Sequence, residues 1–475
     1  MKTFLNISEL HYRTLRAHLF PGDHKEAVAI ALCGRSIRAE RRGLIVHELI
    51  PIPYDQCHTR APDLVHWSTE LVKEQLEKAR KKHLSVVKIH CHPDGPAYFS
   101  NLDTQSDLEL FDSVYGWVND DGPHASLIML PDGKLFGRFI EPDLSFTPID
   151  RIRLVGDDLH FWDHQDATQP LPEQSLRSIQ AFGEGTIGQL QKMRIAVVGC
   201  SGTGSPVIEQ LARFGVGELY LIDPDCIEVK NLNRILNATM EDAIYSSLKV
   251  DVQKSAIEQM GFGTKVHTYA HNLYDDLDLL RELASCDFIF GCVDSVDGRH
   301  LLNTLATFYC IPYLDLGVKL LADGCGGIDH ICSTVHYLQP GESLLERGVY
   351  SAETLRATSL HRANPQEYER LQKEGYIANL PVDSPAVISV NMQVAALAVQ
   401  ELLARIHHFR YSVGNHSGNK NFAIQRWDSI NGTFQHFEDN HPKELLAKYI
   451  GRGDLQPFLN LPEFSPTEQH LNQLV

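Results

Sequence analysis

The sequence has no Cys-x-x-Cys pair among its ten cysteines. Scattered cysteines are typical of a reduced, cytoplasmic protein and exclude a disulfide scaffold. No apolar run reaches the roughly 18 to 20 residues that a membrane helix needs. Glu9, His11 and Arg13 interrupt the N-terminal stretch where a secretory signal would be uniformly apolar. We therefore expect a cytoplasmic chain with no membrane partner.

Positive charge is also scarce, since 43 Lys and Arg face 61 Asp and Glu, for a net charge of −18. Such a surface repels phosphate backbones, so we expect no nucleic-acid partner. The sequence shows no repeats and no low-complexity tract. The 475 residues suggest two or three domains at a prior of about 150 residues each.

The order of strand-like and helix-like segments predicts an α/β protein. Residues 1–145 mix apolar strand-like runs with helical stretches at 69–82 and 104–118. Residues 146–176 are polar and contain two prolines, which is typical of a linker or connecting arm. Strand, helix and strand then alternate from residue 177, which indicates a parallel sheet with crossover helices. We assign 177–440 to this second domain and 441–475 to a C-terminal tail.

A cluster of metal-ligating residue types follows one apolar run in the first domain. VVKIHCH reads as a strand, in which side chains two apart share a face, so His90 and His92 point the same way and Cys91 points away. Ser100 or Asn101 then caps a helix whose first turn carries Asp103. Two imidazoles and one carboxylate leave the fourth position of a zinc ion open, which is the catalytic arrangement.

Zinc-dependent hydrolysis also needs a general base. Glu26 begins a strand-like run in GDHKEAVAIAL and is our first candidate. Glu48 in VHELIPI is the rival, and the sequence leaves both open.

The spacing His-x-His-x7-Ser-x2-Asp resembles that of the JAMM (JAB/MPN+) metalloproteases, which remove ubiquitin-like modifiers from their conjugates. The resemblance covers roughly residues 1–140 and implies a JAB-type α/β domain. It implies that His90, His92 and Asp103 bind zinc, that Glu26 activates water, and that Ser100 steadies the tetrahedral intermediate. Cys91 replaces the usual serine or threonine, at a position that faces away.

A glycine-rich turn opens the second domain, in RIAVVGCSGTGSPVIEQLARFGVGELYLIDPD. Gly199, Gly202 and Gly204 permit a tight turn and close approach of the backbone to phosphates at a helix N-terminus. Asp223 ends the next strand, where an acid accepts hydrogen bonds from ribose hydroxyls. Taken alone, this pattern also suits an NAD-dependent dehydrogenase.

The residues that follow favour a nucleoside triphosphate instead. Two cations and two amides suit a triphosphate better than a hydride carrier, and a further acid could hold Mg²⁺ between phosphates. Beside Asp223, the residues concerned are Asp225, Asn231, Asn233, Arg234, Lys249 and Asp294.

These motifs closely resemble those of the ThiF-type adenylating family, which includes ubiquitin-activating enzymes and sulfur-carrier adenylyltransferases. The resemblance runs from about residue 177 to 435 and implies a Rossmann-like adenylation domain. It implies that Gly202 and Asp223 contact ATP, that Asp294 holds Mg²⁺, and that ribose and phosphates meet Asn231, Asn233, Arg234 and Lys249. Arg177, in RSIQAFG, would reach the ATP of a partner subunit, which implies a homodimer.

The sequence departs from many such relatives, which hold a structural zinc with two Cys-x-x-Cys pairs. Ser343 and Glu346 stand where cysteines would be expected, so we expect no structural zinc and a lobe held by packing alone. Cys325 and Cys332 remain open as thioester-forming nucleophiles. Together with His330 they form only a weak metal motif.

The two resemblances imply a bifunctional enzyme that uses Zn²⁺, ATP and Mg²⁺. One domain would cleave after the C-terminal glycine of a ubiquitin-like protein, and the other would adenylate that terminus, with a conjugating enzyme as a further partner. Two alternatives stay open. The partner could be a sulfur carrier that is never conjugated, or the chain could be a scaffold that has lost one chemistry.

Overall fold

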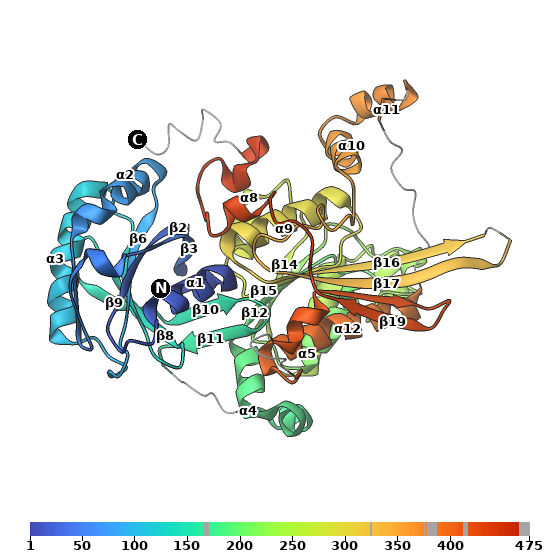
Figure 1. Cartoon of the computed structure of the whole chain (residues 1–475). Helices are drawn as coiled ribbons and strands as arrows, with labels where there is room; N and C mark the ends of the chain where they lie inside the picture. The colour runs from blue at the N-terminus through green and yellow to red at the C-terminus, as the bar shows by residue number, and fades with distance from the viewer. Residues whose placement is uncertain (166–170, 324, 375, 378–386, 412–416, 465–475) are drawn as a thin grey trace. The chain divides into compact units, whose positions relative to one another are not determined.

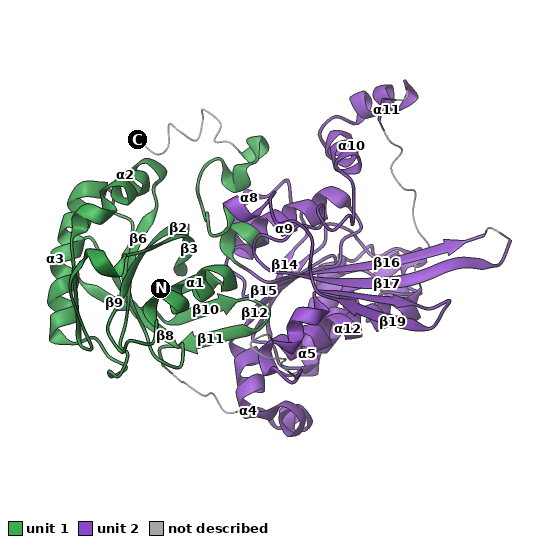
Figure 2. Ribbon diagram, in the orientation of Figure 1, with its two compact units in different colours: residues 1–167, 307–310, 449–475 green, residues 168–306, 311–448 purple. Residues whose placement is uncertain are grey.

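The computed structural model describes all residues except 166–170, 324, 375, 378–386, 412–416 and 465–475. The chain forms two compact units (Figure 2). Unit 1 comprises Met1–Ala167, Thr307–Cys310 and Tyr449–Val475, and unit 2 comprises Thr168–Ala306 and Ile311–Lys448. None of the helices within the described residues is long and apolar enough to cross a membrane.

Unit 1 is built on a mixed sheet with the strand order β11-β10-β1-β3-β2-β6-β7-β8-β9 (Figure 1). In chain order its strands are β1 (Lys2–Ser8), β2 (Val28–Ile37), β3 (Arg41–Pro51), β6 (Ser85–Cys91), β7 (His124–Met129), β8 (Leu135–Ile140), β9 (Phe146–Pro148), β10 (Arg151–Val155) and β11 (Leu159–Asp163). The accompanying helices are α1 (Glu9–Leu19), α2 (Lys73–Lys82) and α3 (Asn101–Val118), and a separate hairpin is formed by β4 (Cys57–Ala61) and β5 (Leu64–Trp67).

Both faces of this sheet are buried, as strand β2 shows. Ala29 and Ala31 belong to the core that α1 covers, whereas Val28, Ile30 and Leu32 belong to the core that α2 and α3 cover. Side chains alternate between the faces of a strand, so an uninterrupted apolar run fills both cores at once. The central strands therefore hold the histidines of β6 in a fixed position between packed layers.

The structure differs from the predicted linker at 146–176. Residues 146–163 form β9, β10 and β11, and β10 pairs in parallel with β1 from Phe4 opposite Arg151 to Ser8 opposite Val155. These strands are short and carry charged residues, so they lack the apolar run that marks a strand in sequence. The partner of β10 lies about 150 residues earlier in the chain, which no local pattern can indicate, whereas β9 pairs with β8 and β11 pairs with β10.

Unit 2 contains a sheet with the order β14-β13-β12-β15-β16-β17-β18-β19. In chain order the strands are β12 (Arg194–Val198), β13 (Glu218–Ile222), β14 (Lys265–Tyr269), β15 (Phe288–Gly291), β16 (Tyr313–Ala322), β17 (Ile328–Leu338), β18 (Ile424–Asp428) and β19 (Thr433–Phe437). The strands from β14 to β16 run parallel, and those from β16 to β19 run antiparallel. This confirms the predicted parallel sheet with crossover helices.

Helices lie on both sides of this sheet, with α5 and α12 on one side and α8 and α9 on the other (Figure 1). Helix α12 packs against α5, β16 and β17. The helices of unit 2 are α4 (Leu176–Lys192), α5 (Gly204–Arg213), α6 (Met240–Ile244), α7 (Lys249–Met260), α8 (Leu277–Leu283), α9 (Val296–Tyr309), α10 (Ala352–Ala363), α11 (Pro365–Lys373) and α12 (Ile388–His407). Most of the apolar side chains of α12 are buried in these contacts.

The segment predicted as a tail from residue 441 also differs, because residues 449–464 pack into unit 1. Gly34 N donates to Gly451 O at 3.1 Å. The guanidinium of Arg38 pairs with Asp454 at 2.8 Å, and Phe458 is fully buried. The paired residues are more than 400 positions apart in the chain, so local composition could not predict these contacts.

A network of ion pairs joins the two segments of unit 2 where cysteine pairs are missing. Arg347 Nη2 lies 2.7 Å from Glu342 Oε2 and 2.8 Å from Asp439 Oδ2. Lys443 Nζ lies 2.6 Å from Glu342 Oε1. Glu346 Oε1 accepts hydrogen bonds from two backbone amides, those of residues 444 and 445. The expectation of packing alone is thus incomplete, because buried charges cross-link this lobe.

Replacing Arg347 is expected to destabilise unit 2 strongly. The Arg347→Ala substitution would leave the buried Asp439 carboxylate without its arginine and Glu342 with Lys443 alone, at a cost of about 3–5 kcal/mol in the free energy of unfolding. Urea denaturation of the full chain measures this loss. Arg356→Ala, at an exposed arginine of α10, is the matched control and should change the free energy by less than about 0.5 kcal/mol. Equal effects of the two variants would contradict a stabilising network.

Candidate active sites

Two of the three predicted zinc ligands, His90 near the end of β6 and His92 just after it, lie on the face that packs toward α3. His90 and His92 are 1% and 5% exposed, and their Nε2 atoms lie 3.2 Å apart. Cys91 points into the opposite core, where Ala27 N donates to its Sγ at 3.3 Å. The predicted orientation of all three residues is confirmed.

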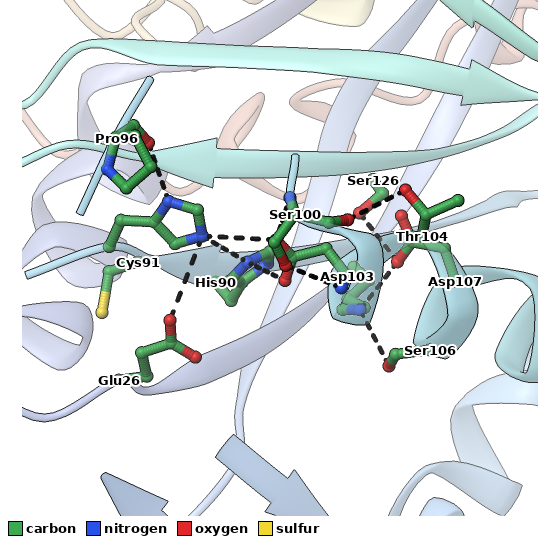
Figure 3. Close-up of polar contacts among 12 residues, drawn as sticks. Glu26, His90, Cys91, Pro96, Ser100, Asp103, Thr104, Ser106, Asp107 and Ser126 are labelled. Atoms are coloured by element: carbon green, nitrogen blue, oxygen red, sulfur yellow. Dashed lines mark hydrogen bonds and ion pairs between the residues drawn. The ribbon is translucent and has the colours of Figure 1, made fainter. Parts of the chain in front are cut away.

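The cap of helix α3 places Asp103 against these imidazoles (Figure 3). Ser100 is the N-cap, whose Oγ accepts from Asp103 N at 3.0 Å and donates to Asp103 Oδ2 at 2.7 Å. Asp103 Oδ1 lies 3.1 Å from His90 Nε2, and Oδ2 lies 3.6 Å from His92 Nε2. The same bonds that begin the helix therefore aim the carboxylate at the histidines.

Strand register brings Glu26 to the same cluster. Val28 stands opposite His90 in the antiparallel pair of β2 and β6, so continuing the register sets Glu26 opposite His92. Directly opposite residues share a face, and Glu26 Oε1 lies 4.0 Å from His92 Nε2. The backbone of Glu26 is held by β4, because its N donates to Ala61 O at 2.8 Å and its O accepts from Arg60 Nε at 3.0 Å.

The rival base lies elsewhere. Glu48 stands opposite Leu32, which pairs with Val86 in β6, six residues before His92. At about 3.3 Å per residue this is roughly 20 Å from the cluster. Glu48 forms an ion pair with Lys78 of α2 instead.

The charges of the cluster suit a divalent metal. Burial alone would raise the pKa of Asp103, but the contacts with His90 and His92 hold this pKa well below its usual range. Burial lowers the pKa of His90, which favours the neutral imidazole that binds metals. Burial raises the pKa of Glu26 to about 7, in the range of a group that both takes and returns protons near neutral pH.

Two further observations favour zinc as the metal that these ligand atoms would bind. Glu26, His90 and His92 offer ligand atoms within 4.8 Å of one another, and Asp103 adds a carboxylate at 3.1 Å from His90. His92 Nδ1 lies 2.9 Å from Pro96 O, the kind of second contact that orients a metal-binding imidazole. Two nitrogens and one carboxylate oxygen converging on one point are a common zinc site with an open position.

Sequence analysis missed a polar network beneath this cluster. Asp107, one turn after Asp103 on α3, is fully buried and accepts from Lys88 Nζ at 2.7 Å and from Arg138 Nη2 at 2.8 Å. Lys88 is two residues before His90 on the same face of β6 (Figure 3 shows Asp107 beside the cluster). The i, i+4 spacing of Asp103 and Asp107 was the available signal, and this pairing holds α3 in register with β6.

In unit 2, the glycine-rich turn connects β12 to α5. Gly199 has φ +91°, and a Cβ on it would lie 2.5 Å from Cys292 O. A Cβ on Gly204 would lie 1.7 Å from Gly199 O. Larger residues are excluded at both positions, so the backbone turns tightly and α5 begins directly behind it, as an anion-binding turn requires.

Asp223 lies at the end of β13, next to this turn. Cys200 N donates to its Oδ2 at 2.8 Å, and Asp225 N donates to its Oδ1 at 3.0 Å. Lys249, at the start of α7, is 5% exposed and lies 2.6 Å from Asp225 Oδ2 and 3.4 Å from Asp223 Oδ1. Burial would lower the pKa of Lys249, but the two carboxylates raise it and keep the ammonium charged.

Arg234 also lies at the turn. A Cβ on Gly202 would come within 3.1 Å of Arg234 Cδ, and Arg234 Nη1 donates to Asn233 Oδ1 at 3.1 Å and to Lys230 O at 2.9 Å. Asn231 is buried, and its Oδ1 accepts from Glu228 N at 3.0 Å. The structure therefore places Arg234 against the glycine-rich turn, whereas the Asn231 side chain caps the short helical segment Val229–Asn231.

For Asp294 and Arg177, the structure gives less evidence of a place beside the glycine-rich turn. Asp294 is exposed and follows β15, whose end touches the turn through Cys292 O near Gly199. Arg177 is exposed on α4, where its Nη1 donates to Gln180 Oε1 at 3.0 Å. Their roles remain predictions.

The cysteines left open by sequence lie in the β16–β17 hairpin. Cys325 is exposed in the turn between the strands, and Cys332 stands opposite Lys319. Burial raises the pKa of Cys332, which disfavours the thiolate form that a nucleophile needs. The ligand atoms of Cys325, His330 and Cys332 do not gather within 4.8 Å of one another, so this part of the described chain offers no metal cluster.

Two family models match the chain. The model of the ThiF family matches residues 174–446, and that of prokaryotic homologs of the JAB domain matches residues 8–135. The first contains the whole glycine-rich turn with Asp223, Lys249 and Asp294, and the second contains the histidine cluster with Glu26.

Curated proteins match a shorter part of the chain. Adenylyltransferase and sulfurtransferase UBA4 of Debaryomyces hansenii is 30% identical over 139 residues, which are 29% of this chain and 30% of that protein. Ubiquitin-like modifier-activating enzyme 5 of Bombyx mori is 26% identical over 165 residues, which are 33% of this chain and 39% of that protein. The chain thus spans about a third of the length of these relatives.

Among solved structures, the match to E. coli MccB with ATP has 18% sequence identity and a TM-score of 0.41, and covers 56% of this chain and 71% of that one. The ThiF match alone covers more than half of the 475 residues. The protein belongs to the ThiF family and carries a JAB-type domain ahead of its ThiF domain.

Proposed function

We propose that this chain acts twice on the C-terminus of a ubiquitin-like protein. The JAB-type unit hydrolyses the peptide or isopeptide bond after the terminal glycine, and the ThiF unit adenylates the glycine carboxylate with MgATP. The observation that carries the proposal is the meeting of His90, His92, Asp103 and Glu26 in a chain whose other unit is a ThiF domain.

In the JAB-type unit, His90, His92 and Asp103 would hold Zn²⁺, which supplies a Lewis acid and a more acidic water when bound. Glu26 takes a proton from the attacking water and delivers it to the leaving nitrogen as the C–N bond breaks. Ser100 donates a hydrogen bond to the tetrahedral oxyanion, which requires its hydroxyl to turn away from Asp103 Oδ2.

In the ThiF unit, the glycine carboxylate attacks the α-phosphorus of ATP, the Pα–O bond to the β-phosphate breaks, and pyrophosphate leaves. Arg234 and Lys249 stabilise the charge that builds on the phosphates, and Asp223 orients the ribose. Asp294 would hold Mg²⁺, since this ion is usually bound by one or two carboxylates together with phosphates. Asp225, Asn231 and Asn233 line the same pocket in this proposal.

Two partners follow from the proposal. Arg177 reaches the nucleotide of a second copy, so the working form is a homodimer. A conjugating enzyme would accept the activated carboxylate. A sulfur-carrier protein is the second candidate substrate, favoured by the similarity to a protein named as both an adenylyltransferase and a sulfurtransferase.

The test uses the full chain and a panel of ubiquitin-like and sulfur-carrier proteins that end in glycine, each also prepared with a short extension after that glycine. We expect cleavage of one extended protein at the glycine, and release of pyrophosphate from MgATP with its processed form. The same protein without its last glycine should support neither reaction. Pyrophosphate release without any cleavage across the panel would contradict the protease half, and cleavage without pyrophosphate would contradict the adenylation half.

A further inference from the structure

Asn391 is a buried residue that no sequence motif marks. It lies in the first turn of α12, the helix that packs beside α5 behind the glycine-rich turn (Figure 1). Its side chain is 2% exposed, and within the described residues its Nδ2 finds no hydrogen-bond partner. A buried amide donor without an acceptor costs free energy, so its retention calls for a ligand that arrives later.

The Nδ2 of Asn391 is aimed at the turn itself. A Cβ on Gly202 would lie 2.4 Å from Asn391 Nδ2 and 3.1 Å from Arg234 Cδ. The neutral donor and the cationic side chain therefore flank the same residue of the turn, from helix α12 and from the segment after β13. Helix α5 begins at Gly204, two residues after Gly202, and the backbone amides at a helix N-terminus favour binding of an anion.

We propose that Asn391 binds a phosphate group of the nucleotide, with its Nδ2–H donating to a non-bridging phosphate oxygen above Gly202. The proposal rests on the proposed MgATP-dependent adenylation. Arg234 supplies charge on one side and Asn391 supplies a fixed, neutral donor on the other, which positions the phosphate without adding to the local charge. Gly202 is required because any side chain would fill the space between them.

A purely structural asparagine looks different in this protein. Asn419 is equally buried, but its Nδ2 donates to Ala404 O at 3.0 Å near the end of α12. Removing a donor that is already satisfied leaves its acceptor unpaired and destabilises the fold, whereas removing an unsatisfied donor does not. The two asparagines are therefore a matched pair for an experiment.

The experiment compares Asn391→Leu, Asn391→Asp and Asn419→Leu in the full chain. Thermal unfolding is measured without nucleotide, and ATP binding with Mg²⁺ is measured by calorimetry. For Asn391→Leu we expect an unchanged or higher Tm without nucleotide and a Kd for ATP raised about 10- to 100-fold, as for loss of a hydrogen bond to a charged group. Asn391→Asp keeps the side-chain size and should weaken ATP binding further, by repulsion. Asn419→Leu should lower Tm and leave the Kd of the remaining folded protein unchanged.

Other outcomes overturn the inference separately from the proposed function. A wild-type Kd in Asn391→Leu, or a Tm lowered as in Asn419→Leu with no effect of Asn391→Asp on Kd, would show that Asn391 is structural. If wild-type protein binds ATP but releases no pyrophosphate with any partner, adenylation fails while the Kd comparison still decides the role of Asn391. Wild-type protein that does not bind ATP would overturn both.

Discussion

The His90→Ala/His92→Ala variant is expected to contain no zinc, whereas wild-type protein purified without chelators should contain about one zinc ion per chain. The two Nε2 atoms lie 3.2 Å apart and 3.1 to 3.6 Å from the oxygens of Asp103, so removing both imidazoles leaves only the carboxylates of Asp103 and Glu26. Zinc favours imidazole nitrogen over a site made of carboxylates alone, so we expect it to be lost during purification. Elemental analysis of both proteins measures the difference and needs no knowledge of the substrate.

The zinc-free variant should also cleave the extended partner protein at a much lower rate. Loss of Lewis-acid stabilisation of about 4 kcal/mol corresponds to roughly a 1000-fold lower rate. Pyrophosphate release from MgATP should stay at the wild-type level, because the glycine-rich turn belongs to the other unit.

A second histidine pair in the same unit provides the control. His58 and His66 lie on the β4–β5 hairpin with ring centroids 5.2 Å apart, but both are exposed, and among the described residues they belong to no cluster of three metal-ligating groups. His58→Ala/His66→Ala should retain both zinc and cleavage. Zinc that persists in His90→Ala/His92→Ala, or is lost from the control, would show that the metal lies elsewhere.

Lys249→Met should abolish adenylation while leaving zinc content and cleavage intact. The ammonium of Lys249 lies between Asp223 and Asp225, so without it two carboxylates face the incoming phosphates unneutralised. Loss of one such positive group in a buried site costs about 3 to 4 kcal/mol of transition-state stabilisation, or roughly 100- to 1000-fold in rate. Partner-dependent ATP–pyrophosphate exchange measures this rate directly.

Lys254→Ala, on the same helix α7, is the control for Lys249→Met and should retain wild-type exchange. Asp294→Ala should likewise lose exchange and keep cleavage, if Asp294 binds Mg²⁺ as proposed. A Lys249→Met protein that exchanges pyrophosphate at the wild-type rate would exclude Lys249 from the reaction. Loss of cleavage as well as exchange in a folded variant would contradict two independent sites.

The histidine cluster was largely predictable because its geometry is local. His90 and His92 share a face through the alternation of a strand, and Ser100 and Asp103 are joined by the first turn of a helix. Each relation spans three residues or fewer, so a short pattern is enough. The choice between Glu26 and Glu48 as the general base could not be made from a short pattern. It depends on how β2 and the residues before it are aligned with β6, which sets the residue opposite His92.

Sequence analysis did not identify residues whose proposed roles depend on contacts between distant parts of the chain. Asn391 lies almost 190 residues after Gly202, and Arg347 meets Asp439 across 92 residues of intervening chain. Neither carries a motif, because a lone asparagine or arginine has the same local pattern on a surface and in a buried site. Their roles became visible only through burial and unpaired or paired atoms.

The amino-acid order alone was sufficient for the fold class, the two kinds of domain and most of the residues at both candidate sites. These follow from periodicity, capping and glycine-rich turns, which short-range sterics and backbone hydrogen bonds impose. The folded chain was needed to bring Glu26 to the histidine cluster, add β9 to β11 to the first sheet, and aim Asn391 at the turn. Such contacts arise when separate elements pack and bury their surfaces together, and packing joins residues without regard to their distance along the chain.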